Sequence, residues 1–183
     1  MKQLSLMILA VFAVAVAGCH RWILPVEPDG GPGGGKQSST LPFETLSIGQ
    51  HCGPGHPDFR DNPSKFKVNH KGEIVVDNEN DLRELWSEIH LGMFPQPDVP
   101  VVDFNKSIVV GVFMGLRGSG GYDIEVKQVT EGDGAITVHY DESRMDTYCM
   151  VTTVITSPFH LIKIDRPSKP LAYAGTQVVR PCE

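Results

Sequence analysis

The chain has few basic residues, few aromatic residues and one long apolar run. Its 183 residues include 16 Lys and Arg against 22 Asp and Glu, which gives a formal net charge of −6 at neutral pH. Because nucleic-acid binding needs a basic face, we expect no nucleic-acid partner. Aromatic residues make up 8% of the chain and hydrophobic residues 40%. These values are ordinary for one small domain.

The long apolar run lies at the N-terminus and is too short for a permanent membrane helix. It occupies residues 4–17 and follows Lys2. A positive start and a short apolar core are typical of a signal peptide. Small residues precede Cys19, as in the lipobox of bacterial lipoproteins, so we predict a lipoprotein signal peptide over 1–18 and a lipid on the Cys19 thiol. The alternative is an ordinary secretory peptide with a chance cysteine.

The residues after the predicted lipidation site indicate where the protein is anchored and how the domain is attached. By resemblance to Gram-negative lipoproteins, His20 at this position favours the outer membrane, with anchoring through fatty-acyl chains such as palmitate. Residues 25–40 read PVEPDGGPGGGKQSST, of which half are Gly or Pro. Such a composition forms a flexible linker. We therefore expect a tether over 19–43 and a β-rich domain over 44–183.

Helical periodicity occurs once in this domain. Leu82, Leu85, Trp86 and Ile89 repeat at the spacing of one helix face. Asn78 precedes this stretch and is a residue type that caps helix starts. The pattern predicts one amphipathic helix whose tryptophan belongs to the core.

Most of the remaining domain has the pattern of short strands. Residues 108–113 are continuously apolar, which predicts a central strand buried on both faces. Residues 122–127 and 135–140 alternate between apolar and polar, as half-buried strands do. We therefore predict a mainly β fold of the α+β class, an antiparallel sandwich or a rolled sheet with one helix. Further candidate strands are residues 150–156, 159–164 and 171–179.

Four glycines gather in GLRGSGGYDIEV, residues 115–126. A dinucleotide-binding loop opens a helix, and a nucleophile elbow requires G-x-S-x-G. Here the glycines precede a strand, and Arg117 stands where the first glycine of an elbow would be. The stretch is therefore predicted to be a bent connection whose glycines tolerate positive φ and let another backbone or a partner approach closely. Its tip is the predicted partner-binding loop, made of Arg117, Gly118, Ser119, Gly120, Gly121 and Tyr122.

Three segments together resemble one protein family. VVGVFMGLRGSGGYDIEVKQV, ITVHYDES and CMVTTVITSPFHLIKI are similar to the C-terminal domain of PrcB-type protease-complex lipoproteins, over residues 66–174. The shared pattern is an apolar strand, a glycine turn that ends in tyrosine, and a Thr-x-Pro-aromatic strand at 156–161. The resemblance implies a β-rich bacterial envelope domain, and its namesake associates with a surface protease and supports its assembly or stability. It implies no catalytic residues.

A few other residues could carry chemistry. His51, Cys52 and His56 are possible metal ligands, but the intervening glycines and proline leave them unrestrained, and no fourth ligand is nearby. The neighbouring carboxylates of Asp141 and Glu142 point to opposite faces of a strand, so they form no acid–base pair. We therefore predict no metal, no cofactor and no enzymatic activity.

Three of the 4 cysteines remain after lipidation, and an exported chain favours a disulfide. A strand that begins at Cys149 and pairs antiparallel with the last strand would bring Cys149 close to Cys182. This geometry favours Cys149–Cys182, and Cys52–Cys182 is the alternative.

Two functions follow from these observations. The first is a non-enzymatic envelope lipoprotein domain that binds or stabilises a protease or another envelope protein. It depends on the family resemblance, the lipid tether and the lack of a convincing catalytic set. The second is a loop-based protease inhibitor, because glycine-rich turns followed by tyrosine also occur in cysteine-protease inhibitors of immunoglobulin-like fold. An inhibition assay separates the two.

Overall fold

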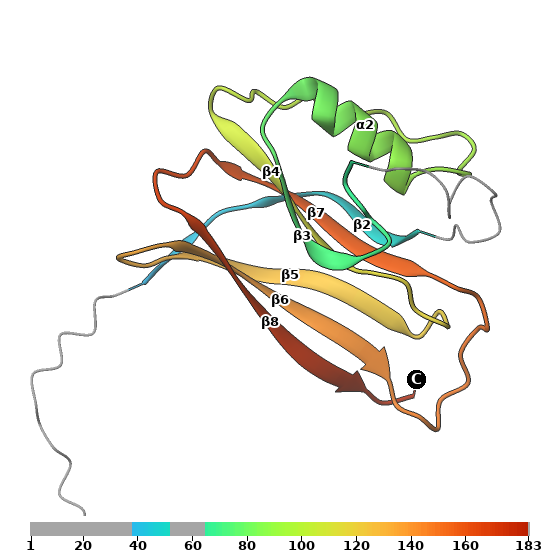
Figure 1. Cartoon of the computed structure of the whole chain (residues 1–183). Helices are drawn as coiled ribbons and strands as arrows, with labels where there is room; N and C mark the ends of the chain where they lie inside the picture. The colour runs from blue at the N-terminus through green and yellow to red at the C-terminus, as the bar shows by residue number, and fades with distance from the viewer. Residues whose placement is uncertain (1–37, 52–64, 183) are drawn as a thin grey trace, which may run out of the picture. The chain divides into compact units, whose positions relative to one another are not determined.

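The computed structural model describes residues 38–51 and 65–182 of the chain. Within these residues, strands and one helix follow one another along the chain (Figure 1). They are β1 (Ser39–Leu41), β2 (Glu44–His51), β3 (Lys71–Val76), α2 (Glu79–Ile89), β4 (Ser107–Met114), β5 (Tyr122–Glu131), β6 (Ile136–Met145), β7 (Ser157–Asp165) and β8 (Leu171–Arg180).

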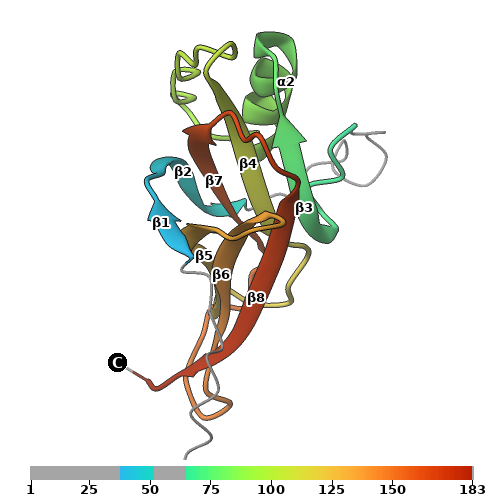
Figure 2. The same cartoon turned by 90° about the vertical axis from the view of Figure 1, so that its left-hand side faces the viewer.

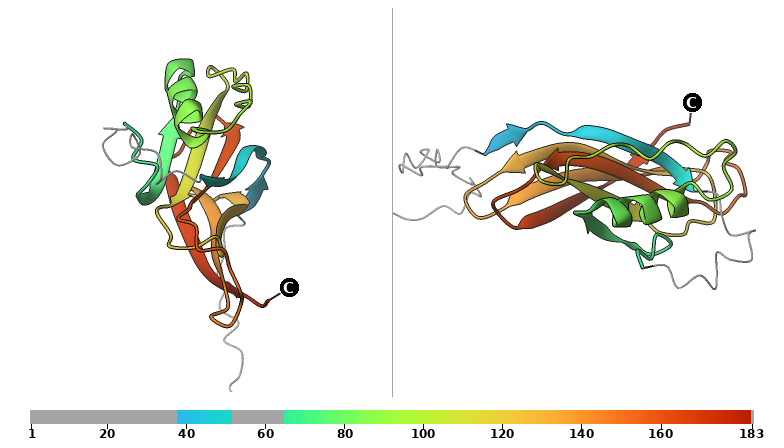
Figure 3. Two further views of the ribbon diagram at one scale, coloured as in Figure 1. Left: turned by 90° about the vertical axis from the view of Figure 1, so that its right-hand side faces the viewer. Right: turned by 90° about the horizontal axis from the view of Figure 1, so that it is seen from above.

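The strands form two four-stranded sheets that pack face to face. The first sheet has the order β1-β5-β6-β8, and the second has the order β2-β7-β4-β3. Helix α2 covers the outer face of the second sheet, as the two side views show (Figures 2 and 3). The predicted mainly β fold with one amphipathic helix is confirmed, and of the two architectures considered the structure is the sandwich.

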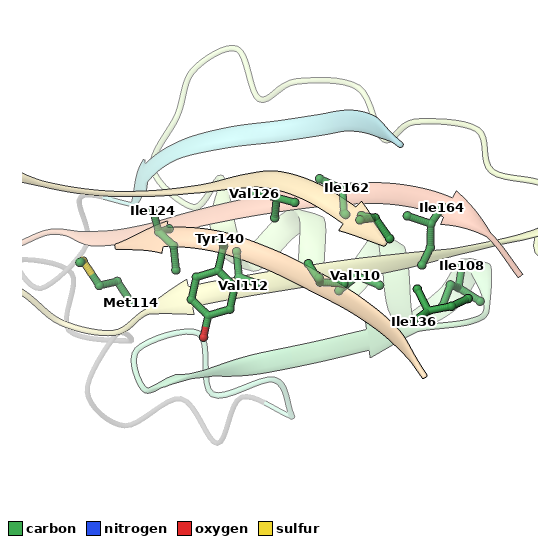
Figure 4. Close-up of a cluster of buried hydrophobic side chains, with 12 residues drawn as sticks. Ile108, Val110, Val112, Met114, Ile124, Val126, Ile136, Tyr140, Ile162 and Ile164 are labelled. Carbon is green, nitrogen blue, oxygen red and sulfur yellow. The ribbon is translucent and has the colours of Figure 1, made fainter. Parts of the chain in front are cut away.

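Strand β4 lies between two apolar layers, which explains its continuous apolar sequence. All of its residues are buried. Alternate side chains, including Val110 and Val112, face the first sheet and meet Val126 and Ile162 in the core between the sheets (Figure 4). The opposite side chains, Val109 and Phe113, pack beneath α2. The prediction of a strand buried on both faces is confirmed.

Helix α2 has the predicted cap and the predicted buried face. The Asn78 side chain accepts a hydrogen bond of 2.9 Å from the backbone N–H of Asp81. The indole Nε1 of Trp86 donates to the Pro97 carbonyl at 2.9 Å, so this buried ring also satisfies its polar atom. The buried residues are Leu82, Leu85, Trp86 and Ile89, as the periodicity predicts.

The predicted strand over residues 150–156 is wrong. Residues 150–155 form no strand and are exposed, and Thr156 makes only an isolated bridge with Arg117. Strand β7 begins instead at Ser157, beside the proline that was expected to separate two strands. Pro158 lies beyond the ladder between β7 and β4, which ends at Phe159, and it stands opposite Gln50 in β2.

The first sheet is not wholly antiparallel. Strands β6 and β8 pair in parallel, with an unbroken register from Ile136↔Leu171 to Met145↔Arg180. Parallel neighbours need a crossover connection, and here β7 in the second sheet provides it.

The sandwich also begins earlier in the chain than expected. Strand β1 falls inside the segment predicted as tether, and it pairs with the end of β5 through Leu41↔Val129. Leu41 and Phe43 are apolar and pack against the core between the sheets. The contact of these two side chains with the core explains why the sandwich includes this part of the predicted tether.

Candidate protein-binding site

The glycine loop, residues 115–121, connects β4 in the second sheet to β5 in the first. Gly115 has φ +72°, and a Cβ built on it would lie 2.7 Å from the backbone nitrogen of Lys71. Gly120 and Gly121, where the sequence also allowed positive φ, do not have it. Within the described residues, Gly92 and Gly115 are the glycines with positive φ.

Glycine is required at 120 and 121 because another segment packs directly on them, which is the close approach that the sequence suggested. A Cβ on Gly120 would lie 2.3 Å from the Thr152 hydroxyl oxygen, and one on Gly121 would lie 2.7 Å from a methyl of Val151. The N–H of Gly120 also donates to the Thr152 carbonyl at 3.0 Å. The glycines therefore allow a close approach between two loops.

The second of these loops is residues 146–156, which we call the disulfide loop. Arg117 and Thr156 exchange two backbone hydrogen bonds, of 2.7 and 3.0 Å, and the Thr156 hydroxyl donates to the Ser119 carbonyl at 2.9 Å. Thr156 is 1% exposed, so its hydrogen bonds to the glycine loop are buried from solvent. The two loops form one hydrogen-bonded unit at one end of the sandwich.

Strand β2 contributes a third element to this end. The Gln50 side-chain amide donates to the carbonyls of Gly120 at 3.2 Å and Tyr122 at 2.7 Å, and to a carboxylate oxygen of Asp123 at 2.9 Å. The Arg117 guanidinium lies 5.6 Å from the centre of the Tyr122 ring. The Gln50 contacts fix the start of β5, and the cation–π contact orients the Arg117 and Tyr122 side chains relative to each other.

A disulfide between Cys149 and Cys182 closes the disulfide loop against the end of β8, with the two Cα atoms 5.2 Å apart. The predicted pair is confirmed, but the strand pairing that was used to predict it is wrong. Cys149 lies after β6, and the parallel register ends with Met145 beside Arg180. Parallel neighbouring strands run in the same direction, so β6 and β8 finish at the same end of the sheet. The residues that follow the two strands therefore meet at that end.

The exposed surface of this end comes mainly from the disulfide loop. Gly118 is exposed, Gly121 is buried, and the other members of the predicted partner-binding loop are half-buried beneath their neighbours. Tyr148 is 92% exposed and Met150 is 100% exposed. Further exposed apolar side chains are Leu116, Val151, Val154 and Ile155. The end therefore presents apolar surface on a cross-linked loop.

Sequence reasoning missed this surface because the residues have the composition of a buried strand. Met150–Ile155 is a run of apolar and β-branched residues, which are typical of strands in general. The disulfide at Cys149 holds the run outside both sheets. Two adjacent threonines within an otherwise apolar run are the signal that could have indicated an exposed segment.

The Thr-x-Pro-aromatic pattern at residues 156–161 has a structural role. The Ser157 hydroxyl donates to the Val68 carbonyl at 2.9 Å, and Phe159 packs in the core under α2. His160 accepts a hydrogen bond at Nδ1 from the Val126 N–H at 2.8 Å, and its Nε2 lies 2.9 Å from the Thr45 hydroxyl. Burial lowers the pKa of His160 to about 4, so the ring is neutral at neutral pH.

A pocket of about 270 Å³ lies on the outer side of the first sheet, next to β2. Its lining includes carboxylates, two of which are paired with cations: Asp123 with Arg180, and Glu125 with Lys127. In the part of the chain that the structure describes, no group of three His, Cys, Asp or Glu could hold a metal ion.

Two candidates from the sequence lie outside the described residues. One is Cys19, the predicted lipidation site. The other is the rejected metal-ligand segment of His51, Cys52 and His56, of which only the backbone of His51 is described. No helix in residues 38–51 or 65–182 is long and apolar enough to cross a membrane.

Comparison with known proteins agrees with the resemblance found in the sequence. The family model described as PrcB C-terminal matches residues 108–165, from β4 to the end of β7. Searches of curated proteins and of solved structures found no match. The matched residues contain the glycine loop, the disulfide loop and the Thr-x-Pro-aromatic strand, so this part of the chain is similar to the PrcB C-terminal family.

Proposed function

We propose that this protein is a non-enzymatic, lipid-anchored envelope protein whose sandwich binds a protease or another component of a protease complex. The observation that carries the proposal is the apolar, cross-linked end of the sandwich, formed by the glycine loop and the disulfide loop. The family supports it, since PrcB C-terminal domains take their name from a protease complex.

The exposed side chains of the disulfide loop suit protein recognition. Aromatic and methionine side chains are enriched in the cores of protein interfaces. Tyr148 and Met150 stand almost fully in solvent, and Ile155 of the same loop is 42% exposed. Tyrosine provides a large contact area at a low entropic cost, and methionine adapts its shape to the partner.

The loop is also held in place before any partner arrives. The disulfide anchors its start, and the paired backbone bonds between Arg117 and Thr156 anchor its end. A loop that is already ordered loses less conformational entropy on binding. The disulfide loop is held at both ends, and this is more typical of a binding surface than of a loop that only connects two strands.

The proposed anchor would attach the sandwich at the end opposite this surface, because β1 pairs with the end of β5 and the glycine loop precedes the start of β5. Cys19 would carry the lipid, and the glycine-rich tether would let the domain reach a partner at the same membrane surface. A chain of this kind spans on the order of 20 Å for a segment of this length. We propose the outer membrane as the location, because His20 follows the lipidated cysteine.

Capture from detergent-solubilised envelopes tests the proposal. The tagged full chain is expected to retain a protease or a protease-complex subunit, identified by mass spectrometry. Met150→Glu should abolish that capture, because it places a charge at the centre of the apolar surface. Phe94→Glu is the matched control, since Phe94 is also fully exposed, at 101%, but belongs to the connection between α2 and β4. Equal capture by both variants would show that the disulfide-loop surface is not the binding site.

Activity assays on the captured protease distinguish a stabilising role of the domain from an inhibitory one. If the domain stabilises its partner, the captured protease cleaves its substrate and survives heating longer with the domain bound. If the domain is an inhibitor, added domain suppresses cleavage, and Met150→Glu restores it.

A further inference from the structure

Strand β8 is a long strand at a free edge of the first sheet. It pairs with β6 on one side over its whole length, and within the described residues no strand pairs with its other side. Figure 1 shows β8 along the lower border of the sandwich. The register from Leu171 to Arg180 contains no bulge.

The pattern of hydrogen bonds shows which backbone groups of β8 point outward. The N–H of Ile136 donates to the Pro170 carbonyl, and the N–H of Asp146 donates to the Arg180 carbonyl. In a parallel ladder, alternate residues bond to the same neighbour. Even-numbered residues of β8 therefore face β6. The N–H and C=O groups that face away belong to Leu171, Tyr173, Gly175, Gln177 and Val179.

Strand β8 also lacks the features that usually protect an edge. Proteins block free edges with charges, prolines, bulges or very short strands. The residues from Leu171 to Val179 include no charged residue and no proline. Each of the other edges has such a feature: β1 has 3 residues, β2 contains a bulge between Thr45 and Ser47, and β3 has the sequence KGEIVV with two charges.

We propose that β8 pairs antiparallel with β8 of a second copy of this chain, about a twofold axis at Gly175. The outward-facing residues are placed symmetrically around Gly175. Leu171 of one copy would therefore oppose Val179 of the other, and Tyr173 would oppose Gln177. Each opposed pair of this type exchanges two backbone hydrogen bonds. The first sheet would then continue through both copies, with self-complementary edges as a twofold interface requires.

The side chains are compatible with this register. On the outer face, Ala174 would lie opposite Thr176 of the second copy, and Ala172 opposite Val178. These pairs combine a small residue with a β-branched one, and none brings like charges together. Arg180 would lie opposite Pro170. On the inner face, the added strand would cover Leu171 and Tyr173, which are core residues that remain half-buried in one copy.

The position of the N-terminal strand leaves this edge accessible. Strand β1 lies at the opposite edge of the first sheet from β8. The chain therefore enters the sandwich at one edge and would associate at the other. Two copies could therefore pair through β8 without displacing β1.

Disulfide trapping with two differently tagged full chains tests the register. One copy carries Ala174→Cys and the other carries Thr176→Cys, and both carry Cys52→Ser to remove an unrelated thiol. Directly opposed residues of a non-hydrogen-bonded pair have Cα atoms about 4.5 Å apart, within the reach of a disulfide. After mild oxidation of cells, a non-reducing gel should show a covalent dimer that contains both tags.

The matched control pairs Ala174→Cys with Ala172→Cys. In the proposed register these cysteines are separated by about four residues along the strand, or roughly 13 Å, and should not cross-link. No dimer with either pair, or equal dimer with both pairs, would overturn the proposal. A cross-link to a different protein would also overturn it, because the edge would then have another occupant.

Sedimentation of the unaltered full chain in density-matched detergent gives a second readout that needs no substitution. The proposal expects twice the monomer mass at micromolar concentration. Val179→Pro should shift the equilibrium toward monomer by at least tenfold in Kd, because it removes an outward N–H and leaves the ladder to β6 intact. A monomer at all concentrations up to about 100 µM, well above typical affinities of specific dimers, would overturn the proposal.

Discussion

The imidazole of His160 in β7 accepts a hydrogen bond from the backbone N–H of Val126 in β5, and so joins the two sheets through a buried polar contact. The bonded nitrogen is Nδ1, which leaves the ring proton on Nε2 to be donated to the Thr45 hydroxyl. Strand β5 has a bulge between Val126 and Gln128, where it leaves its regular ladder. The histidine therefore satisfies a buried N–H next to a break in the sheet.

This contact predicts that the domain becomes less stable in mild acid. Burial lowers the pKa of His160 from 6.5 to about 4, with the nearby charges of Glu125 and Lys127 acting in opposite directions. Between these pH values the unfolded chain binds the extra proton, so the free energy of unfolding falls as pH decreases from 6.5 toward 4. The loss is on the order of 3 kcal/mol at most. Urea titrations across this pH range measure it.

The variant His160→Ala tests the source of that pH dependence. It should reduce stability at pH 7 by about 1–3 kcal/mol, because the Val126 N–H loses its acceptor, and it should flatten the slope between pH 6.5 and 4. Burial also lowers the pKa of His90, so a smaller slope of the same sign remains. His139→Ala, on the outer face of the first sheet, is the control for loss of an imidazole. An unchanged slope in His160→Ala would contradict the assignment.

Gly115 and Gly118 form a matched pair in one loop. Gly115→Ala should destabilise the domain by about 1–3 kcal/mol, because a Cβ would be strained at φ +72° and would meet the Lys71 backbone. Gly118→Ala should change stability by less than about 0.5 kcal/mol, since its Cβ would have nothing within 4 Å. Thermal melts compare the two, and equal effects would show that the loop does not have this backbone conformation.

The disulfide should stabilise both the fold and the recognition surface. The bond spans 33 residues, and closure of a loop of that length contributes about 3–4 kcal/mol in the chain-entropy treatment. The double variant Cys149→Ser with Cys182→Ser should lose about this free energy of unfolding. It should also weaken partner capture under conditions where the domain remains folded. Peptide mapping without reduction checks the pairing, and a bridge to Cys52 would refute it.

The lipid anchor is tested by Cys19→Ser. The variant should move from the membrane fraction to the soluble fraction, because a thioether-linked lipid can no longer form. Mass spectrometry of the N-terminal peptide from the unaltered protein should show the added acyl chains. Unchanged membrane association together with an unmodified cysteine would rule out lipid anchoring.

Local patterns predicted the elements whose environment follows from their own sequence. The spacing of Leu82, Leu85, Trp86 and Ile89 identifies α2, because one face of a helix must be apolar to be buried. The continuous apolar run of β4 identifies a strand with two buried faces. In both cases the burial pattern lies within one segment.

Elements that depend on distant partners could not be predicted in this way. Residues 150–155 have strand composition, yet the bond from Cys149 to Cys182 holds their segment at the end of the sandwich. The need for glycine at 120 and 121 comes from Thr152 and Val151, which lie far along the chain. The parallel pairing of β6 and β8 depends on where the chain returns after β7. Most of the candidate site arises from such distant contacts.

Site-specific photocrosslinking in living cells shows whether the end formed by the glycine and disulfide loops contacts a protease-complex partner. A photoreactive phenylalanine analogue replaces Tyr148 in one strain and Phe94 in another, and both positions are exposed. We predict a crosslink to a protease or protease-complex subunit from position 148 and none from position 94. A crosslink to that partner from position 94 but not from 148 would contradict the account.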